Sequence, residues 1–479
     1  MAMQEKDGGS LPPEQGIGIV YLYMIVLVAA VGGFLFGYEI QLISPAIIFL
    51  KTEFALTPGW YGAVMGSAIL GCPVGPLAGL WLADRFGRRK TLVFSSVVFL
   101  VSAIGCALAG NMMQFIAWRF VSGIGIGLAA TVSPMYIAEV APAHLRGRLV
   151  LVNQLAIVVG GILSAVVAYL LSDGGHWRWM FASQAVPVFG LMAGLVLVPE
   201  SPRWLAMVGR YGDAMGVLAK INGQAQAEKD MSEIRTELGD EEGNLAELLQ
   251  SGVRMALLIG IGLMVFSQIC GATIIHMYAP TLFVESGIST ETDAILNNIY
   301  ICCWASLCTV ISFWIVRTFG RRPIIICGSI VMTVGHLLLF LCFMHHVSTL
   351  LTLAAMMLTS AAFTLTLAPL SWVILSEIFP NRVRGKAMSL ATVIMFTSSY
   401  VAVNVFPPAM SWFKDRYGHP GGTFLIFAGI CLAGGLFVWL TLPETKDKTL
   451  EEIGEFWLKR DHDRELKQEE DRQGLDAVL

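Results

Sequence analysis

The chain has 479 residues, of which 56% are apolar and only 14% are charged, and its mean hydropathy is +0.69. Soluble proteins usually carry about 25% charged residues, so the composition excludes the two or three soluble domains that the length alone would suggest. The net charge of −4, without a basic face that carries interleaved aromatic residues, argues against a nucleic-acid partner.

Apolar runs of about 20 residues recur along the whole chain, and each is long enough to cross the ~30 Å hydrocarbon core of a bilayer. A backbone in lipid must satisfy its own hydrogen bonds, so we expect helices and an all-α membrane protein. The twelve predicted spans are about 19–50, 61–83, 91–110, 112–140, 148–171, 178–198, 252–286, 291–316, 323–344, 348–378, 385–412 and 421–442.

Charged segments divide these spans into two sets of six. The central segment contains helix-like runs such as KDMSEIRTEL, and the C-terminal tail is expected to be helical as well. We therefore predict an N-terminal tail at 1–18, a six-helix bundle at 19–198, a helical loop at 199–251, a second six-helix bundle at 252–442 and a C-terminal helix and tail at 443–479.

Lysine and arginine cluster in alternate loops, after the second, fourth, eighth and tenth spans. Because cytoplasmic loops carry the excess of basic residues, we expect these loops, both tails and the central segment to be cytoplasmic. No loop contains an Asn-x-Ser/Thr sequon, which fits a multi-pass protein of a bacterial inner membrane.

Glu39 lies inside the first span, flanked by apolar residues and distant from both ends. A charge at mid-membrane costs about 2.5–3.5 kcal/mol on insertion scales, so it needs a partner, a proton or a wet cavity. Arg119 of the fourth span is the natural partner. Burial favours a neutral carboxyl and a nearby guanidinium favours a charged one, so Glu39 could load and unload a proton. A static ion pair and a direct contact with substrate are the alternatives.

Three motifs occur twice in the same order. ADRFGRRK (83–90) returns as VRTFGRRP (316–323), AEVAPAHLRGR (138–148) as SEIFPNRVRGK (376–386), and VPESPRW (198–204) as LPETKDK (442–448). Their nearly constant offset indicates an internal duplication with one copy in each set of six spans. Parallel halves with a central site between them are a known transporter architecture.

The charged residues of these motifs are predicted to form gating salt bridges at the inner membrane surface. Such pairs would hold the inner ends of the halves together in one state and release them in the other; the alternative is that they only anchor loops. Arg317 stands where the first copy has an acid, so we expect a weaker latch on the second half. The predicted gating residues are Asp84, Arg88, Arg89, Glu139, Arg146, Glu200, Arg321, Arg322, Glu377, Arg384 and Glu444.

Over nearly its whole length the chain resembles the sugar porter family of the major facilitator superfamily. Besides the repeated motifs, GGFLFGYE (32–39), WRFVSGIGIG (118–127) and LPETKDKTLEEI (442–453) carry the resemblance. It implies two six-helix bundles, a cytoplasmic helical segment and alternating access to a central sugar site. It also implies that proton-coupled members carry an acid at the position of Glu39 and an arginine in span 4, whereas facilitative members carry asparagine there.

The resemblance further implies where the substrate binds. Gln154 and Gln268 match family ligand positions, Trp372 matches a tryptophan of span 10, and Phe36 matches an aromatic residue of the first span. Gln154, Ile157 and Gly161 fall at i, i+3 and i+7, so they share one helix face. The remaining predicted substrate-binding positions are Ser267, Thr273, Tyr278, Met395 and Ser399.

Several of these positions depart from the family. The departures replace amides and aromatic residues, so we expect a more apolar and roomier site that suits a less hydroxylated sugar, a larger glycoside, a polyol or a cyclic acid. His276 is new at the edge of this site, and we interpret it as a packed bystander. The altered positions are Gly161, Ser267, Thr273, Met277, Ala305, Met395, Phe396 and Ser399.

The sequence thus predicts a secondary active transporter that moves a sugar or sugar-like solute together with a proton. A facilitative uniporter, in which Glu39 never exchanges its proton, and a non-transporting solute sensor are the alternatives. An enzyme is not expected, since GIGIG (123–127) lies in a membrane helix with no preceding strand. We expect no cofactor and no metal; the expected partners are the solute, a proton and the bilayer, with a monomeric protein.

Overall fold

The computed structural model describes residues 13–238, 253–287, 290–379 and 381–444. Within these residues twelve helical spans are long and apolar enough to cross a membrane, as the sequence predicts. The predicted C-terminal helix beyond 444 and the end of the central loop, 239–251, lie outside the described residues.

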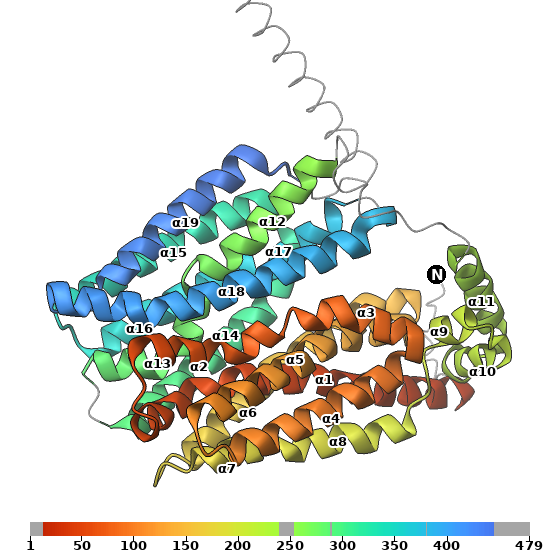
Figure 1. Cartoon of the computed structure of the whole chain (residues 1–479). Coiled ribbons are helices and arrows are strands. Elements are labelled where there is room, and N and C mark those ends of the chain that lie inside the picture. The colour runs from red at the N-terminus through yellow and green to blue at the C-terminus, as the bar shows by residue number, and fades with distance from the viewer. Residues whose placement is uncertain (1–12, 239–252, 288–289, 380, 445–479) are drawn as a thin grey trace, which may run out of the picture.

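The first half contains eight helices (Figure 1). They are α1 (Pro13–Glu53), α2 (Pro58–Gly71), α3 (Val74–Phe86), α4 (Arg88–Ala107), α5 (Met112–Val140), α6 (Ala143–Leu170), α7 (Trp177–Ala182) and α8 (Ala185–Leu197). Helix α1 begins six residues before the predicted start of the first span, because its polar first turns extend beyond the apolar run.

Three shorter helices follow and form what we term the loop bundle: α9 (Pro202–Met207), α10 (Tyr211–Asn222) and α11 (Gln224–Leu238). They have a small apolar core of their own, built around Trp204, Leu218 and Met231. The central segment is therefore helical over the residues that the structure describes.

The second half repeats the pattern. It contains α12 (Val253–Ile269), α13 (Ala272–Glu285), α14 (Glu291–Thr318), α15 (Arg321–Met344), α16 (Thr349–Ala362), the π-helix η2 (Phe363–Leu367), α17 (Ala368–Glu377), α18 (Asn381–Tyr417) and α19 (Gly422–Thr441).

Four predicted spans are broken rather than continuous: α2–α3, α7–α8, α12–α13 and α16–η2–α17. The break in the seventh span falls at Gly271, whose φ of 87° is left-handed. It frees the carbonyl of Cys270, which accepts from Cys431 Sγ at 3.3 Å and contacts His336 Nε2 at 2.8 Å. Irregular backbone at membrane depth is tolerated only when protein groups satisfy it in this way.

The helices that carry the candidate site approach each other closely through glycines. A Cβ added to Gly37 of α1 would lie 1.8 Å from the carbonyl oxygen of Ile157 in α6, and one on Gly160 of α6 would lie 2.1 Å from that of Phe34 in α1. Small residues of this kind let membrane helices pack backbone to backbone. This close contact between α1 and α6 holds Glu39, two residues after Gly37, within the first half.

The two halves meet on the side of the molecule opposite the loop bundle, which we term the far side, and their ribbons draw apart toward the loop bundle (Figure 1). On the far side Tyr61 of α2 and Thr281 of α13 share a hydrogen bond of 2.5 Å. A Cβ on Gly62 of α2 would lie 2.6 Å from the carbonyl oxygen of Asn404 in α18. The halves are therefore closed against each other on the far side.

Candidate functional site

A buried ion pair lies inside the first half, where the sequence predicts it. Arg119 Nη1 of α5 binds Glu39 Oε1 of α1, and the two residues are 0% and 2% exposed. The same Glu39 oxygen accepts a hydrogen bond from Ser122 Oγ at 2.6 Å. Ser122 lies three residues after Arg119, so both side chains leave the same face of α5.

This ion pair is incompletely satisfied. Glu39 Oε2 and the Arg119 atoms Nε and Nη2 are buried and have no hydrogen-bond partner among the described residues. The guanidinium carbon of Arg119 lies 5.7 Å from the centre of the Phe181 ring, which offers a cation–π contact. One oxygen of the Glu39 carboxylate is therefore bound twice, and the other has no partner among the described residues.

The predicted substrate face of α6 is accessible over its length. Gln154 is exposed, whereas Ile157 and Gly161 are half-buried, and Phe36 of α1 is half-buried as well. Trp372 of α17, in the second half, is 40% exposed. Other parts of the protein therefore leave at least some of the surface of these side chains uncovered.

The predicted positions of the seventh span lie at its break. Gln268 Nε2 donates to Ser267 Oγ at 3.1 Å, just before Gly271, and Thr273 follows in the first turn of α13. Tyr278 lies deeper: it is 0% exposed and its hydroxyl donates to the carbonyl of Val403 at 2.8 Å. In this conformation Tyr278 packs against helix α18 and does not offer its hydroxyl to a solute.

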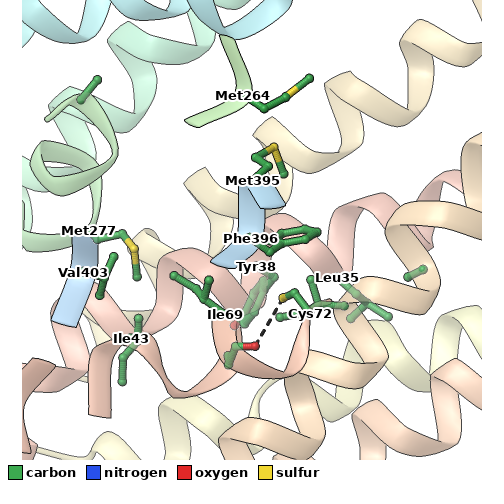
Figure 2. Packing of buried hydrophobic residues seen from close by; sticks show 14 of the residues in the cluster. Leu35, Tyr38, Ile43, Ile69, Cys72, Met264, Met277, Met395, Phe396 and Val403 are labelled. Carbon is green, nitrogen blue, oxygen red and sulfur yellow. Dashed lines mark hydrogen bonds between the residues drawn. The ribbon is translucent and has the colours of Figure 1, made fainter. Parts of the chain in front are cut away.

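The predicted positions of span 11 are buried in an apolar cluster that joins both halves. Met395 is 9%, Phe396 is 7% and Ser399 is 5% exposed. Figure 2 shows Met395 and Phe396 of α18 together with Met264 of the second half and Leu35 and Tyr38 of α1. The replacement of polar and aromatic family residues by Met395 and Phe396 therefore extends the apolar core at this point.

His276 is bound rather than free, as the sequence interpretation expects. Its Nε2 lies 3.0 Å from Ser360 Oγ, and its ring meets Phe363 edge-on. Its backbone carbonyl accepts a bond from Ser44 of the first half at 3.5 Å.

The first copy of the charged motif forms a compact network at the loop-bundle end of the helices. Arg88 Nη2 donates to Glu139 Oε1 at 2.9 Å, and its Nη1 lies 3.1 Å from Asp84 Oδ1. Glu139 also accepts from Ser201 Oγ. Glu200 accepts from the backbone N–H of Arg89 at 3.0 Å, so an acid caps the positive end of helix α4.

The second copy reproduces the arginine–glutamate pair and the helix cap, but Arg317 stands at the position of Asp84. Arg321 Nη2 donates to Glu377 Oε1 at 2.9 Å. Glu444 accepts from the backbone N–H of Arg321 at 2.9 Å and of Arg322 at 3.2 Å, as Glu200 does for the first copy. The Arg322 side chain donates to the carbonyl of Trp439 at 2.5 Å, and that of Arg89 to the carbonyl of Leu195 at 2.6 Å.

In this conformation the predicted gating residues make no ion pair between the two halves among the described residues. Each of these ion pairs lies within one half, so they do not fasten the halves together in this conformation, in which the halves are closed on the far side instead. Arg146 is exposed and Arg384 is half-buried, and no ion pair joins either of them to another described residue. The motifs thus brace the helix ends of their own half.

The unequal burial of the two networks gives a test. Arg88 and Glu139 are 7% and 9% exposed, whereas Arg321 and Glu377 are 15% and 26% exposed. We expect Arg88→Gln to lower the free energy of unfolding by about 3 kcal/mol and Arg321→Gln by about 1 kcal/mol. Thermal unfolding in detergent should rank them in that order, with exposed Arg146→Gln as an unchanged control. Equal midpoints would contradict the ranking.

Sequence reasoning missed three polar residues next to the candidate site: Ser122, Gln41 and Asn298. The i+3 spacing from Arg119 was a signal for Ser122. Nothing in the sequence pairs Gln41 with Asn298, because they lie 257 residues apart and meet only through the packing of the two halves.

The two bundles, the buried ion pair and the twinned charge networks define a membrane transporter of the major facilitator type. A family model described as "Sugar (and other) transporter" matches residues 25–457, and the chain belongs to this family of sugar porters. It is 36% identical to the D-xylose-proton symporter of Escherichia coli K12, over 91% of this chain and 96% of that one. It is 34% identical to the arabinose-proton symporter of Bacillus subtilis, over 94% and 98%.

Solved structures of the E. coli xylose transporter share the fold. The inward-open form superposes with a TM-score of 0.80 at 33% identity, over 91% of this chain and all of that one. The form bound to 6-bromo-6-deoxy-D-glucose gives 0.74 at 35% identity, over 92% and 100%. Of these two, the present arrangement is more similar to the inward-open form.

Proposed function

We propose that this protein is a secondary active transporter that imports a sugar or sugar-like solute together with a proton. The buried Glu39–Arg119–Ser122 cluster carries the proposal. A carboxylate in the interior of a membrane bundle, with one unbound oxygen, is suited to take up a proton from one side and release it to the other as its surroundings change. The symport named for the xylose and arabinose relatives supports this reading.

The proposed cycle is alternating access. The far side is the outer face and the loop-bundle side is the cytoplasmic face, since the basic loops gather there. Outer closure through Tyr61 and Thr281 gives the inward-facing state, and parting of these contacts gives the outward-facing state. Both tails are then cytoplasmic, in a bacterial inner membrane, and the transporter acts as a monomer.

The solute binds between Gln154 of the first half and Gln268 and Trp372 of the second. The apolar side chains of Met395 and Phe396 favour a solute with fewer hydroxyls or a larger apolar face than a common hexose, since solute hydroxyls left without partners would be costly. Aromatic faces such as that of Trp372 pack on the apolar face of a ring.

Glu39→Gln tests the coupling, because glutamine keeps the shape of the side chain and cannot exchange a proton. In proteoliposomes with an imposed pH gradient we expect the variant to lose accumulation of solute against its gradient and to keep counterflow exchange. Uphill uptake that survives in the variant would sink the assignment of Glu39. Wild-type uptake that ignores the pH gradient would favour the uniporter, and no flux of any solute would favour the sensor.

A further inference from the structure

One pair of amides joins the two halves close to the candidate site. Gln41 Nε2 of α1 donates to Asn298 Oδ1 of α14 at 3.4 Å. Gln41 lies two residues after Glu39 and belongs to the first half, whereas Asn298 belongs to the second. The distance is long for an N–H···O bond, whose usual length is about 2.9–3.0 Å, so the contact is weak.

The amide donor of Asn298 is without an acceptor in the part of the chain that the structure describes. The residue is 0% exposed, and its Nδ2 has no hydrogen-bond partner among the described residues. A buried donor without an acceptor costs about 1–3 kcal/mol, so native proteins rarely keep one without a reason. The unused donor of Asn298 marks a place where an acceptor is missing.

Gln41 lies against the substrate face of α6. A Cβ added to Gly161 would lie 3.8 Å from Gln41 Cβ and 4.0 Å from Gln41 Cγ. Gly161 continues the face that carries Gln154 and Ile157, and because it has no side chain, Gln41 lies over the space beside it. Gln41 is only half-buried, so a solute on this face can reach it.

We propose that Gln41 and Asn298 are specificity-determining ligands of the transported solute, one from each half, which bond each other while no solute is bound. This inference rests on the proposed function. A hydroxyl group both donates and accepts, so one hydroxyl of the solute can accept from Asn298 Nδ2 and donate to the amide oxygen of Gln41. The pair thereby adds two amides to those of Gln154 and Gln268.

Equilibrium binding to the purified protein tests the pair. The probes are D-xylose, D-glucose, myo-inositol and their monodeoxy derivatives, and the variants are Gln41→Ala and Asn298→Ala. For the probe that wild type binds, we expect each variant to bind about tenfold more weakly, which is the loss of one good hydrogen bond. The derivative that lacks the bound hydroxyl should bind wild type and variants equally.

The neighbouring residue offers a matched control. Asn297 is half-buried on the same helix, and its Nδ2 donates to the carbonyl of Asp293 at 2.8 Å. Asn297→Ala should leave the binding of every probe unchanged. If an alanine variant is not monodisperse, Gln41→Leu and Asn298→Leu keep the volume of the side chain and remove only the amide.

A relocated amide sharpens the test. In the double variant Gln41→Ala/Gly161→Gln, the first substitution removes the side chain that lies over residue 161, and the second places an amide in that space from α6. A side chain can be added at Gly161 because its Cβ would make only ordinary van der Waals contacts. We expect this double variant to regain at least half of the lost affinity and to respond again to deletion of the same hydroxyl.

Two results would overturn the inference. If Gln41→Ala changes the affinity of every probe and deoxy derivative by one common factor, the pair only fastens the halves, and the proposed function stands. If wild type binds none of these hydroxylated probes, a pair of amides that reads a solute hydroxyl is overturned, whereas the proposed transport of a less hydroxylated solute stands.

Discussion

Arg119→Leu is expected to lower the free energy of unfolding by about 3–5 kcal/mol and to abolish uptake. The substitution leaves the carboxylate of Glu39, which is 2% exposed, without the cation that compensates its charge. Removal of one partner from a buried pair is strongly destabilising because the other charge stays desolvated. The loss should appear as a lower midpoint of thermal unfolding in detergent and a smaller yield of monodisperse protein.

The double variant Arg119→Leu/Glu39→Gln is the control for this prediction. Neutralising both partners removes the uncompensated charge, so most of the lost stability should return, while uphill uptake stays absent. Ser122 can still bond the amide of the new glutamine. Single and double variants that unfold at the same temperature would show that the two charges are not energetically linked.

The second large effect is expected at Gly123, where we predict that a single methyl group destabilises the first half. A Cβ at this position would lie 1.9 Å from the carbonyl oxygen of Ala68 and 2.9 Å from Gly71 Cα. These are backbone atoms of α2 that no rotamer change can move, so α5 and α2 must separate. Gly123→Ala should cost about 1–3 kcal/mol as overpacking, and Gly123→Leu should prevent folding.

Gly190 supplies the matched control, because a Cβ added there in α8 meets no atom within 4 Å. Gly190→Ala should leave the thermal midpoint unchanged or raise it slightly, since alanine favours a helix over glycine. If Gly123→Ala and Gly190→Ala unfold at the same temperature, close packing of α5 on α2 is not what the glycine provides.

The sequence predicted the twelve spans well because each is an apolar run bounded by charged loops, as at 83–90 and 316–323. It missed the breaks inside them. The π-helix η2 (Phe363–Leu367) and the left-handed Gly271 cannot be predicted from the hydropathy of the sequence. They form because neighbouring helices satisfy the freed backbone groups. The sequence context of GIGIG, a membrane helix without a preceding strand, was enough to exclude nucleotide binding. The packing role of these glycines could be recognised only once the structure placed α2 against α5.

The parts of the candidate site that could be predicted from the sequence are those where a single residue is unusual for its surroundings. Glu39 and Arg119 are isolated charges in apolar runs, so each is expected to need a partner of opposite charge. In the structure they form an ion pair with each other. Asn298 is one of several polar residues in its span, and only the fold shows that its amide is buried beside Gln41. The repeated motifs predicted which charges meet, as for Arg321 and Glu377, but not that each pair stays inside its own half.

The loop bundle follows the first half in the chain and is bonded to it. Trp204 Nε1 donates to the carbonyl of Asp84 at 2.8 Å, Ser201 binds Glu139, and Tyr136 donates to the carbonyl of Pro199 at 2.5 Å. In the proposed alternating-access cycle, we therefore expect α9–α11 to move together with the first bundle. A dye on exposed Lys229 of α11, paired with one at Arg317 of the second bundle, would report the rocking as a change in energy transfer while leaving the permeation route unlabelled.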